Sequence, residues 1–361
     1  MPTVLEIFKE ITKIQRCSGN HKDFIEYMKE ISKKLEYICL VDEANNILCK
    51  KEDSNANIVF QSHYDIVCLN DFCIPQIVED DTTLKAIDST LGADNGIGCS
   101  YMIALMYENF DGEFLFTSDE EIGLIGANGL NLPINSKYML NLDSEDEGKI
   151  CIGCAGGVDI IAKNSNKKIV PNIENLDLYE ISISNLQGGH SGVDIDKNIP
   201  NGIKLLVKTI KECKAKLLDI NGGERINSIP VNVKAIIASS TPPISSHEFM
   251  KIEKIDTKSE HLNIYDDKII DFIYDFQNGV RAMNDELHVV QTSINLAIIK
   301  TGIDGIKIEL SGRSMDNEDL KELKNQTIRM LQNYGFEVST NGKYPAWKPD
   351  INEFTNKVLE I

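Results

Sequence analysis

Short apolar runs alternate with amphipathic segments along this chain, and three of the runs end abruptly in polar residues. These runs are Asn57–Ser62, Glu113–Thr117 and Tyr138–Leu142. Apolar runs without alternation are typical of strands buried on both faces, as in a parallel sheet covered by helices. The segment Asn95–Asn109 predicts the crossover helix between two of these strands. We therefore expect chemistry where the strands stop, because open parallel sheets form their sites at the carboxyl ends of strands.

The rest of the chain continues the alternation of helix and strand. The first half adds two amphipathic helices and a strand, predicted over residues 1–20, Lys22–Leu35 and Asn46–Lys50. A change of composition after Gly157 marks a second α/β domain. Its predicted elements are three strands and a helix: Leu178–Ser184, Val289–Ile299 and Ile306–Leu310, and Asn201–Leu217.

Composition and charge describe a soluble chain of 361 residues, in which 56 acidic and 37 basic residues give a net charge of −19. The length suits two domains, since single hydrophobic cores stop growing near roughly 250–300 residues. The acid excess argues against a nucleic-acid partner and against docking on an anionic membrane, because both carry negative charge. No segment approaches the roughly 20 consecutive apolar residues that a membrane span needs.

The nine cysteines are an odd number without a framework of spacings. This pattern favours reduced, buried thiols over disulfides and therefore a cytoplasmic location. The single C-x-x-C, Cys151–Cys154, lacks a second pair downstream that could complete a zinc site. We expect a buried turn there, with a metal or redox role as the less favoured alternative.

His63 and Asp94 are the first two candidates for chemistry. In an extended backbone, residues i and i+2 face the same way, so Asp65 can accept a hydrogen bond from one His63 nitrogen and leave the other for a metal. A structural histidine is the alternative. Asp94 follows Gly92, and the surrounding glycines allow a tight turn that places this carboxylate at the start of a helix. There it could bridge two cations, or act only as an N-cap.

Acidic residues follow the next two strands. Asp119, Glu120 and Glu121 are consecutive, and such crowding of like charges costs free energy unless a cation neutralises it. Because Glu120 and Glu121 point in different directions, one can bind metal while the other handles a proton. A solvated acidic loop is the alternative. Asp143 supplies a further carboxylate after the third strand.

Taken together, one histidine and several strand-end carboxylates describe a hydrolytic site with two metal ions. The chain resembles the M20 metallopeptidases, and within them the aminoacyl-histidine dipeptidase branch. The resemblance runs through seven strings: HYDIV, TLGADNGIG, TSDEEIGLIGA, NLDSEDEGKICIGCAGG, GGHSGVDI, NGGERINSIP and YPAWKPD. It implies an α/β catalytic domain with a mostly parallel sheet covered by helices, and an inserted α/β lid domain.

The resemblance also implies the metal ligands and the base. His63 and Asp143 would hold one zinc and Glu121 the other, with Asp94 as the bridge. Mn²⁺ or Co²⁺ could replace zinc, because histidine and carboxylate ligands accept several divalent ions. Glu120 would deprotonate the attacking water and pass the proton to the leaving amine. The implied reaction is hydrolysis of Xaa-His and related small dipeptides.

Four further residues receive roles from the resemblance. Asp65 would orient His63, and His190 in the lid would stabilise the oxyanion of the tetrahedral intermediate. Asn227 would bind the substrate backbone. Arg313 would clamp the substrate carboxylate, although the string SGRSMD is offset by one residue from the expected pattern, which leaves a surface ion pair as the alternative.

The resemblance divides the chain into a catalytic part over 1–158, a lid over 159–343 and the start of a returning catalytic segment over 344–361. Relatives continue with a HAGLECG-like motif whose histidine is the remaining ligand of the zinc at Glu121, and no histidine follows Trp347. We therefore expect weak activity of the chain as it stands, either as a fragment of a dipeptidase or as a non-catalytic interaction protein. The expected partner is a small peptide, with a homodimer as a further option.

Overall fold

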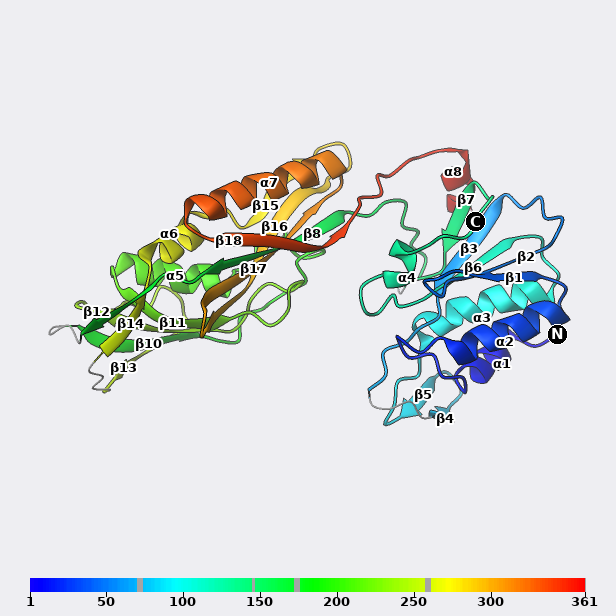
Figure 1. Cartoon of the computed structure of the whole chain (residues 1–361), viewed down its shortest axis with the longest axis horizontal. Helices are drawn as coiled ribbons and strands as arrows, with labels where there is room; N and C mark the ends of the chain where they lie inside the picture. The colour runs from blue at the N-terminus through cyan, green and yellow to red at the C-terminus, as the bar shows by residue number, and fades with distance from the viewer. Residues whose placement is uncertain (70–73, 145–146, 172–175, 257–260, 361) are drawn as a thin grey trace. The chain divides into compact units, whose positions relative to one another are not determined.

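A computed structural model describes residues 1–360 except 70–73, 145–146, 172–175 and 257–260 (Figure 1). The chain divides into two compact units, Met1–Ile150 and Cys151–Ile361. The division falls slightly before the predicted boundary at residue 158. The roles of the second unit as a lid and of residues 344–361 as a returning catalytic segment stay predictions.

The first unit is built on a five-stranded sheet in the order β1-β2-β6-β3-β7. Strand β3 is parallel to β6 and to β7, as predicted, whereas β1 and β2 join the sheet antiparallel. The elements of this unit are α1 (Val4–Ile11), α2 (Lys22–Lys34), β1 (Ile38–Val41), β2 (Ile47–Lys50), β3 (Ile58–His63), β4 (Gln76–Glu79), β5 (Leu84–Ile87), α3 (Ala93–Tyr107), β6 (Glu113–Thr117), α4 (Ile125–Asn128) and β7 (Tyr138–Asn141).

Helices α1, α2 and α3 cover one face of this sheet (Figure 1). Phe8 from α1, Phe24 from α2 and Met102 from α3 are fully buried against Phe116 of β6. Burial of such side chains contributes roughly 1.5–3 kcal/mol each. A smaller cluster around Leu115 packs on the other face, so the central strands are covered on both sides. That double cover explains why their sequences are apolar without alternation.

The second unit contains a nine-stranded antiparallel sheet in the order β13-β10-β12-β11-β16-β17-β8-β18, with β15 also paired to β16. Strands β9 and β14 form a separate pair. The elements are β8 (Gly156–Asn164), β9 (Lys167–Pro171), β10 (Asp177–Ile183), α5 (Gly202–Glu212), β11 (Lys216–Gly222), β12 (Val233–Ser239), β13 (Met250–Ile255), β14 (His261–Tyr265), α6 (Asp267–Asp275), β15 (Gly279–Asn284), β16 (Val289–Gly302), β17 (Gly305–Ser314), α7 (Asn317–Asn333), β18 (Glu337–Tyr344) and α8 (Glu353–Leu359).

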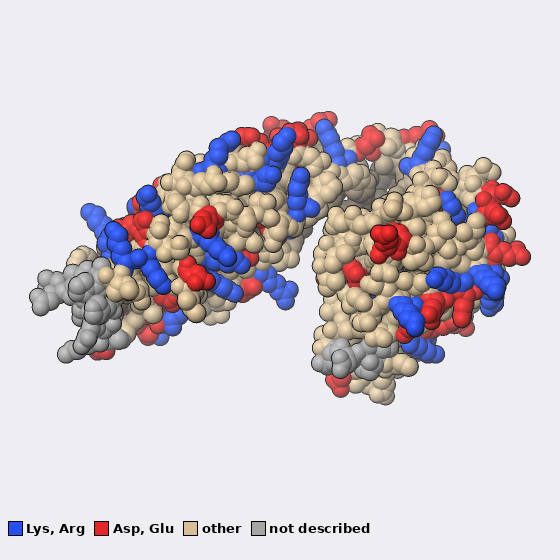
Figure 2. Space-filling view, viewed as in Figure 1, with Lys and Arg blue, Asp and Glu red and all other residues tan. Residues whose placement is uncertain are grey.

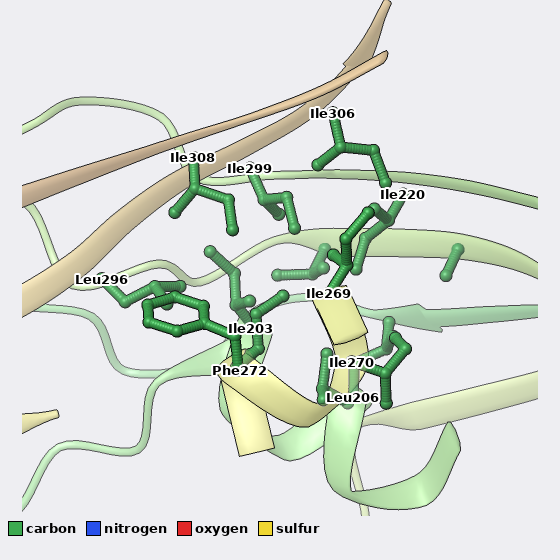
Figure 3. Close-up of a cluster of buried hydrophobic side chains, with 14 of the residues drawn as sticks. Ile203, Leu206, Ile220, Ile269, Ile270, Phe272, Leu296, Ile299, Ile306 and Ile308 are labelled. Carbon is green, nitrogen blue, oxygen red and sulfur yellow. The ribbon is translucent and has the colours of Figure 1, made fainter. Parts of the chain in front are cut away.

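The core of the second unit lies between its helices and this sheet. Figure 3 shows Ile203 of α5 and Phe272 of α6 packed among isoleucine and leucine side chains of β16 and β17, such as Leu296 and Ile308. The predicted helix over Asn201–Leu217 is shorter than expected. It ends at Glu212, because the following residues enter β11.

Two expectations about cysteine were wrong. Cys17 and Cys68 form a disulfide, although the spacing pattern favoured reduced thiols throughout. The reason is tertiary: Cys17 pairs with Ile66 in a β-bridge, which brings two distant cysteines together. Cys151 and Cys154 are exposed, so the C-x-x-C is not a buried turn.

Acidic and basic side chains are interspersed over the visible face of both units (Figure 2). Within the part of the chain that the structure describes, no helix combines the length and apolar character needed to cross a membrane.

Candidate active site

His63 ends strand β3 and is 1% exposed. Its Nδ1 lies 3.0 Å from the backbone carbonyl of Asp65 and 3.5 Å from a carboxylate oxygen of the same residue. Its Nε2 faces Asp94 Oδ1 at 3.0 Å and Asp143 Oδ2 at 3.8 Å. Burial by itself would lower the pKa of His63, but the bond to Asp65 and the charges of Asp143 and Asp94 raise it to about 9. A cationic group is therefore strongly stabilised at this position.

Asp65 is fully buried and connects His63 to the acidic turn after β6. Its carboxylate accepts hydrogen bonds from the Ser18 hydroxyl at 2.8 Å, from the Glu120 N–H at 3.0 Å and from the Glu121 N–H at 3.3 Å. Burial opposes ionisation, yet the interaction with His63 and these bonds lower the pKa of Asp65. Asp65 therefore contacts His63, as predicted, and also holds the backbone of Glu120 and Glu121 in place.

Asp94 lies at a kink where α3 begins. The N-cap of the helix is Gly92, which has a φ of +70°, and no side chain caps it. A simple N-cap role for Asp94 is therefore excluded. The buried Arg16 donates to the carbonyl of Gly92 at 2.7 Å and to that of Tyr64 at 2.9 Å. A Cβ at Gly96 would lie 2.5 Å from the Arg16 guanidinium. Glycine at this position therefore leaves space for the Arg16 side chain.

The acidic turn follows β6 and is held in place, unlike a solvated loop. Asp119 is 8% exposed and adopts a left-handed backbone with φ of +49°. Glu120 and Glu121 are half-buried. Burial raises the pKa of both carboxyl groups, and the charge of Asp94 raises that of Glu121 further. The crowding of carboxylates predicted from the sequence is therefore present in the structure.

Three of the predicted ligands form one group. The ligand atoms of His63, Asp94 and Glu121 all lie within 4.8 Å of one another, and this is the group of metal-binding type found among the described residues. Asp143 adds a carboxylate oxygen 3.8 Å from His63 Nε2. One imidazole nitrogen with several carboxylate oxygens suits a divalent transition-metal ion, and the raised pKa of His63 reflects an excess of negative charge that such an ion would neutralise. The residues fit a metal.

His190 lies on an exposed loop of the second unit, in a β-bridge with Ser228. The Gly192 N–H donates to its Nδ1 at 3.2 Å. A neutral ring that accepts a hydrogen bond at Nδ1 carries its proton on Nε2, which is then a donor. Burial and the charge of Arg313 lower the pKa of His190, which favours the neutral ring.

Arg313 lies in β17 opposite Gly157, and its guanidinium is close to the same loop. A Cβ at Gly192 would meet the His190 ring at 2.9 Å and the Arg313 guanidinium at 3.2 Å. Arg313 Nη1 donates to the Tyr344 hydroxyl at 3.0 Å, while its buried Nε has no hydrogen-bond partner. Asn227 is half-buried. It lies beside this loop, because its backbone carbonyl accepts a hydrogen bond from the Ser191 N–H at 2.8 Å. Arg313 therefore lies between Tyr344 and the loop of His190, and its role in substrate binding stays a prediction.

Comparison with known proteins finds similarity to peptidases. No protein-family model matches it. It is 28% identical over 397 residues to cytosol non-specific dipeptidase of Escherichia coli (strain K12), which covers 96% of this chain and 81% of that protein. Its fold is similar to aminoacylhistidine dipeptidase from Vibrio alginolyticus, with a TM-score of 0.81 and 24% identity over 98% of this chain and 81% of the other. It is also similar to an M20 family metallo-carboxypeptidase from Sulfolobus solfataricus, with a TM-score of 0.51 and 14% identity over 99% and 82% of the two chains.

The α/β fold is therefore similar to that of solved peptidases, and the histidine and carboxylates at the strand ends form a cluster of metal-binding type. The sequence similarity to a dipeptidase extends over nearly the whole chain. The chain is thus similar in sequence to a dipeptidase and in fold to solved dipeptidase and M20 metallopeptidase structures, which agrees with the resemblance that its motifs predicted.

Sequence analysis missed several residues that contact the site. Arg16, Ser18 and His21 precede the first strand, and Tyr344 is the last residue of β18 in the second unit. The first three belong to no motif with a recognisable spacing, and Tyr344 begins the string YPAWKPD without having been singled out. The signal that could have marked Arg16 is an arginine followed by small residues just before a helix start, which is too common to be specific.

Proposed function

We propose that this protein hydrolyses dipeptides with the help of two divalent cations, with Glu120 as the general base. The convergence of the ligand atoms of His63, Asp94 and Glu121 at the ends of neighbouring parallel strands carries the proposal. We assign His63 and Asp143 to one cation and Glu121 to the other, with Asp94 bridging them. Zinc is the proposed metal, with Mn²⁺ or Co²⁺ as substitutes.

A divalent cation in such a site lowers the pKa of water and polarises a carbonyl oxygen. Glu120 takes a proton from the attacking water and delivers it to the amine nitrogen as the peptide bond breaks. Its raised pKa suits both steps, because a base whose pKa lies nearer neutrality accepts and releases a proton more readily. Asp65 supports the site by keeping the Nδ1 side of His63 occupied, so that Nε2 faces the ligand carboxylates.

The substrates that we propose are Xaa-His and related small dipeptides. Arg313 binds the terminal carboxylate, for which a guanidinium offers two parallel hydrogen bonds. Asn227 binds the peptide backbone. His190 donates from Nε2 to the developing oxyanion, a role that the Gly192 N–H supports by occupying Nδ1.

We also propose a cytoplasmic location and a homodimer. The Escherichia coli relative is named as a dipeptidase of the cytosol. The disulfide between Cys17 and Cys68 is unusual for that compartment. Cell fractionation tests the location, and sedimentation of the purified protein tests the dimer.

Paired glutamine variants of the two neighbouring glutamates test the mechanism. Glu120→Gln should lower kcat by about 10²–10⁴-fold and keep the metal, because it removes proton transfer and leaves the ligands in place. Glu121→Gln should lose metal and activity together. Glu43→Gln, at an exposed position of the same unit, is the matched control and should behave as the wild type.

Elemental analysis gives the metal content of each variant, and hydrolysis of dipeptides that end in histidine gives kcat and KM. Equal metal loss in Glu120→Gln and Glu121→Gln would show that the two roles are assigned wrongly. A wild-type protein that is active after complete metal removal would contradict the proposed mechanism as a whole.

A further inference from the structure

The segment that connects α1 to α2 runs alongside the residues that follow β3. Cys17 pairs with Ile66 in a parallel bridge. The Ile66 N–H donates to the Arg16 carbonyl at 3.0 Å, and the Ser18 N–H donates to the Ile66 carbonyl at 3.2 Å. Residues 16–21, which we name the connecting segment, are therefore attached to the chain beside His63.

The connecting segment also occupies both carboxylate oxygens of Asp119. The Gly19 N–H donates to Oδ1 at 2.7 Å, and His21 Nε2 lies 3.1 Å from Oδ2. The side chains of His21 and Asp119 are each 11% exposed, so water competes little for this contact. Asp119 is not one of the proposed ligands, but its backbone leads directly into Glu120 and Glu121.

The contact of Asp119 with Gly19 and His21 matters because of the backbone conformation of Asp119. Its φ of +49° is in the left-handed region, which disfavours residues with a Cβ unless the surroundings hold them there. The chain turns at this residue and presents Glu120 and Glu121 immediately afterwards. The N–H groups of both glutamates then reach the Asp65 carboxylate. Whatever holds Asp119 therefore also determines the position of the two glutamates.

His21 is itself held at a defined position. It is the N-cap residue of α2, and its ring meets the Tyr64 ring edge-on at 5.8 Å. Tyr64 in turn stacks on Phe24 of the same helix, with ring centroids 4.7 Å apart. The imidazole thus joins a buried aromatic group to the acidic turn.

We propose that His21 is a positioning residue for the metal site, which acts by holding Asp119 and thereby the turn that presents Glu120 and Glu121. The inference rests on the proposed function, because it concerns the ligand and the base of that site. Without the imidazole, Oδ2 of Asp119 loses its partner, and the Gly19 N–H remains as the contact from the connecting segment to this carboxylate. Loss of such outer partners of metal ligands typically costs about 10–100-fold in metal affinity or activity.

Two variants of His21 and one control test this role in the full chain. His21→Ala removes the contact, whereas His21→Gln keeps an N–H donor that can reach Asp119. The control is Lys50→Met, which removes the partly buried ion pair between Lys50 and Glu113, at 3.2 Å. Glu113 begins β6 and the acidic turn follows its end, so the control perturbs the same strand far from the glutamates.

Three measurements are made on each protein: zinc affinity by competition with a chelating dye, amide hydrogen exchange of residues 119–125, and kcat and KM for a dipeptide. In His21→Ala we expect zinc affinity or kcat to fall about 10–100-fold and exchange in the turn to accelerate, with KM changed little. His21→Gln should recover most of the loss. Lys50→Met should retain zinc affinity, turn exchange and kcat.

Wild-type zinc affinity and wild-type turn exchange in His21→Ala would overturn the inference. An equal loss in Lys50→Met would overturn it too, because the effect would then be a general loss of stability. Failure of the proposed function has a different signature: the wild type would bind no zinc and cleave no dipeptide. Hydrogen exchange of the turn would still decide whether His21 holds Asp119.

Discussion

Removal of the disulfide between Cys17 and Cys68 should destabilise the first unit strongly. The two cysteines are separated by 51 residues, and the loop that they close contains α2 and the first three strands. In the chain-entropy description, a loop of this length restricts the unfolded chain by about 4 kcal/mol. For a unit of about 150 residues, a loss of that size lowers the melting temperature by roughly 10 °C.

The double variant Cys17→Ser with Cys68→Ser tests this value. Scanning calorimetry should show the transition of the first unit at a lower temperature and the transition of the second unit unchanged, and treatment of the wild type with a reductant should reproduce the shift. Cys151→Ser is the control, because this exposed thiol of the second unit is free. A double variant that melts at the wild-type temperature, with the wild type insensitive to reductant, would refute the reasoning.

Two further predictions concern the second unit. His190→Ala should lower kcat by about 10²–10³-fold and leave the metal content unchanged, because the lost hydrogen bond is made mainly in the transition state; normal kcat with poorer folding would indicate a structural histidine. Tyr344→Phe should raise KM several-fold for dipeptides with a free carboxylate while kcat stays near wild type, because Arg313 loses the hydroxyl that orients it. The same KM increase for carboxyl-amidated dipeptides would contradict that explanation.

Much of the first unit could be predicted because its central strands are covered on both faces. Strand β6 has the predicted bounds, β3 is shifted by one residue at both ends, and β7 ends one residue earlier than predicted. Such strands are mainly apolar, so the sequence changes character near the point where each strand stops. His63, Glu120 and Glu121 stand at those points, which is why a local pattern was enough to propose them.

The end of α5 and the cysteine pairing could not be predicted in this way. The apolar pattern after Glu212 suits a helix as well as a strand, and only pairing with β12 decides for β11. Free thiols were expected because a cysteine count carries no information on which residues meet. Cys17 reaches Cys68 because the connecting segment packs beside Ile66.

The sequence by itself determined which side chains could do chemistry, because apolar runs report burial and the acidic residues follow those runs directly. Only the tertiary structure decided which groups hold them in place. His21 precedes Asp119 by 98 residues, and no periodicity links the two. Their contact depends on the packing of the start of α2 against the turn after β6. A hydrophobic pattern within one segment indicates the burial of that segment but does not indicate which other segment it contacts.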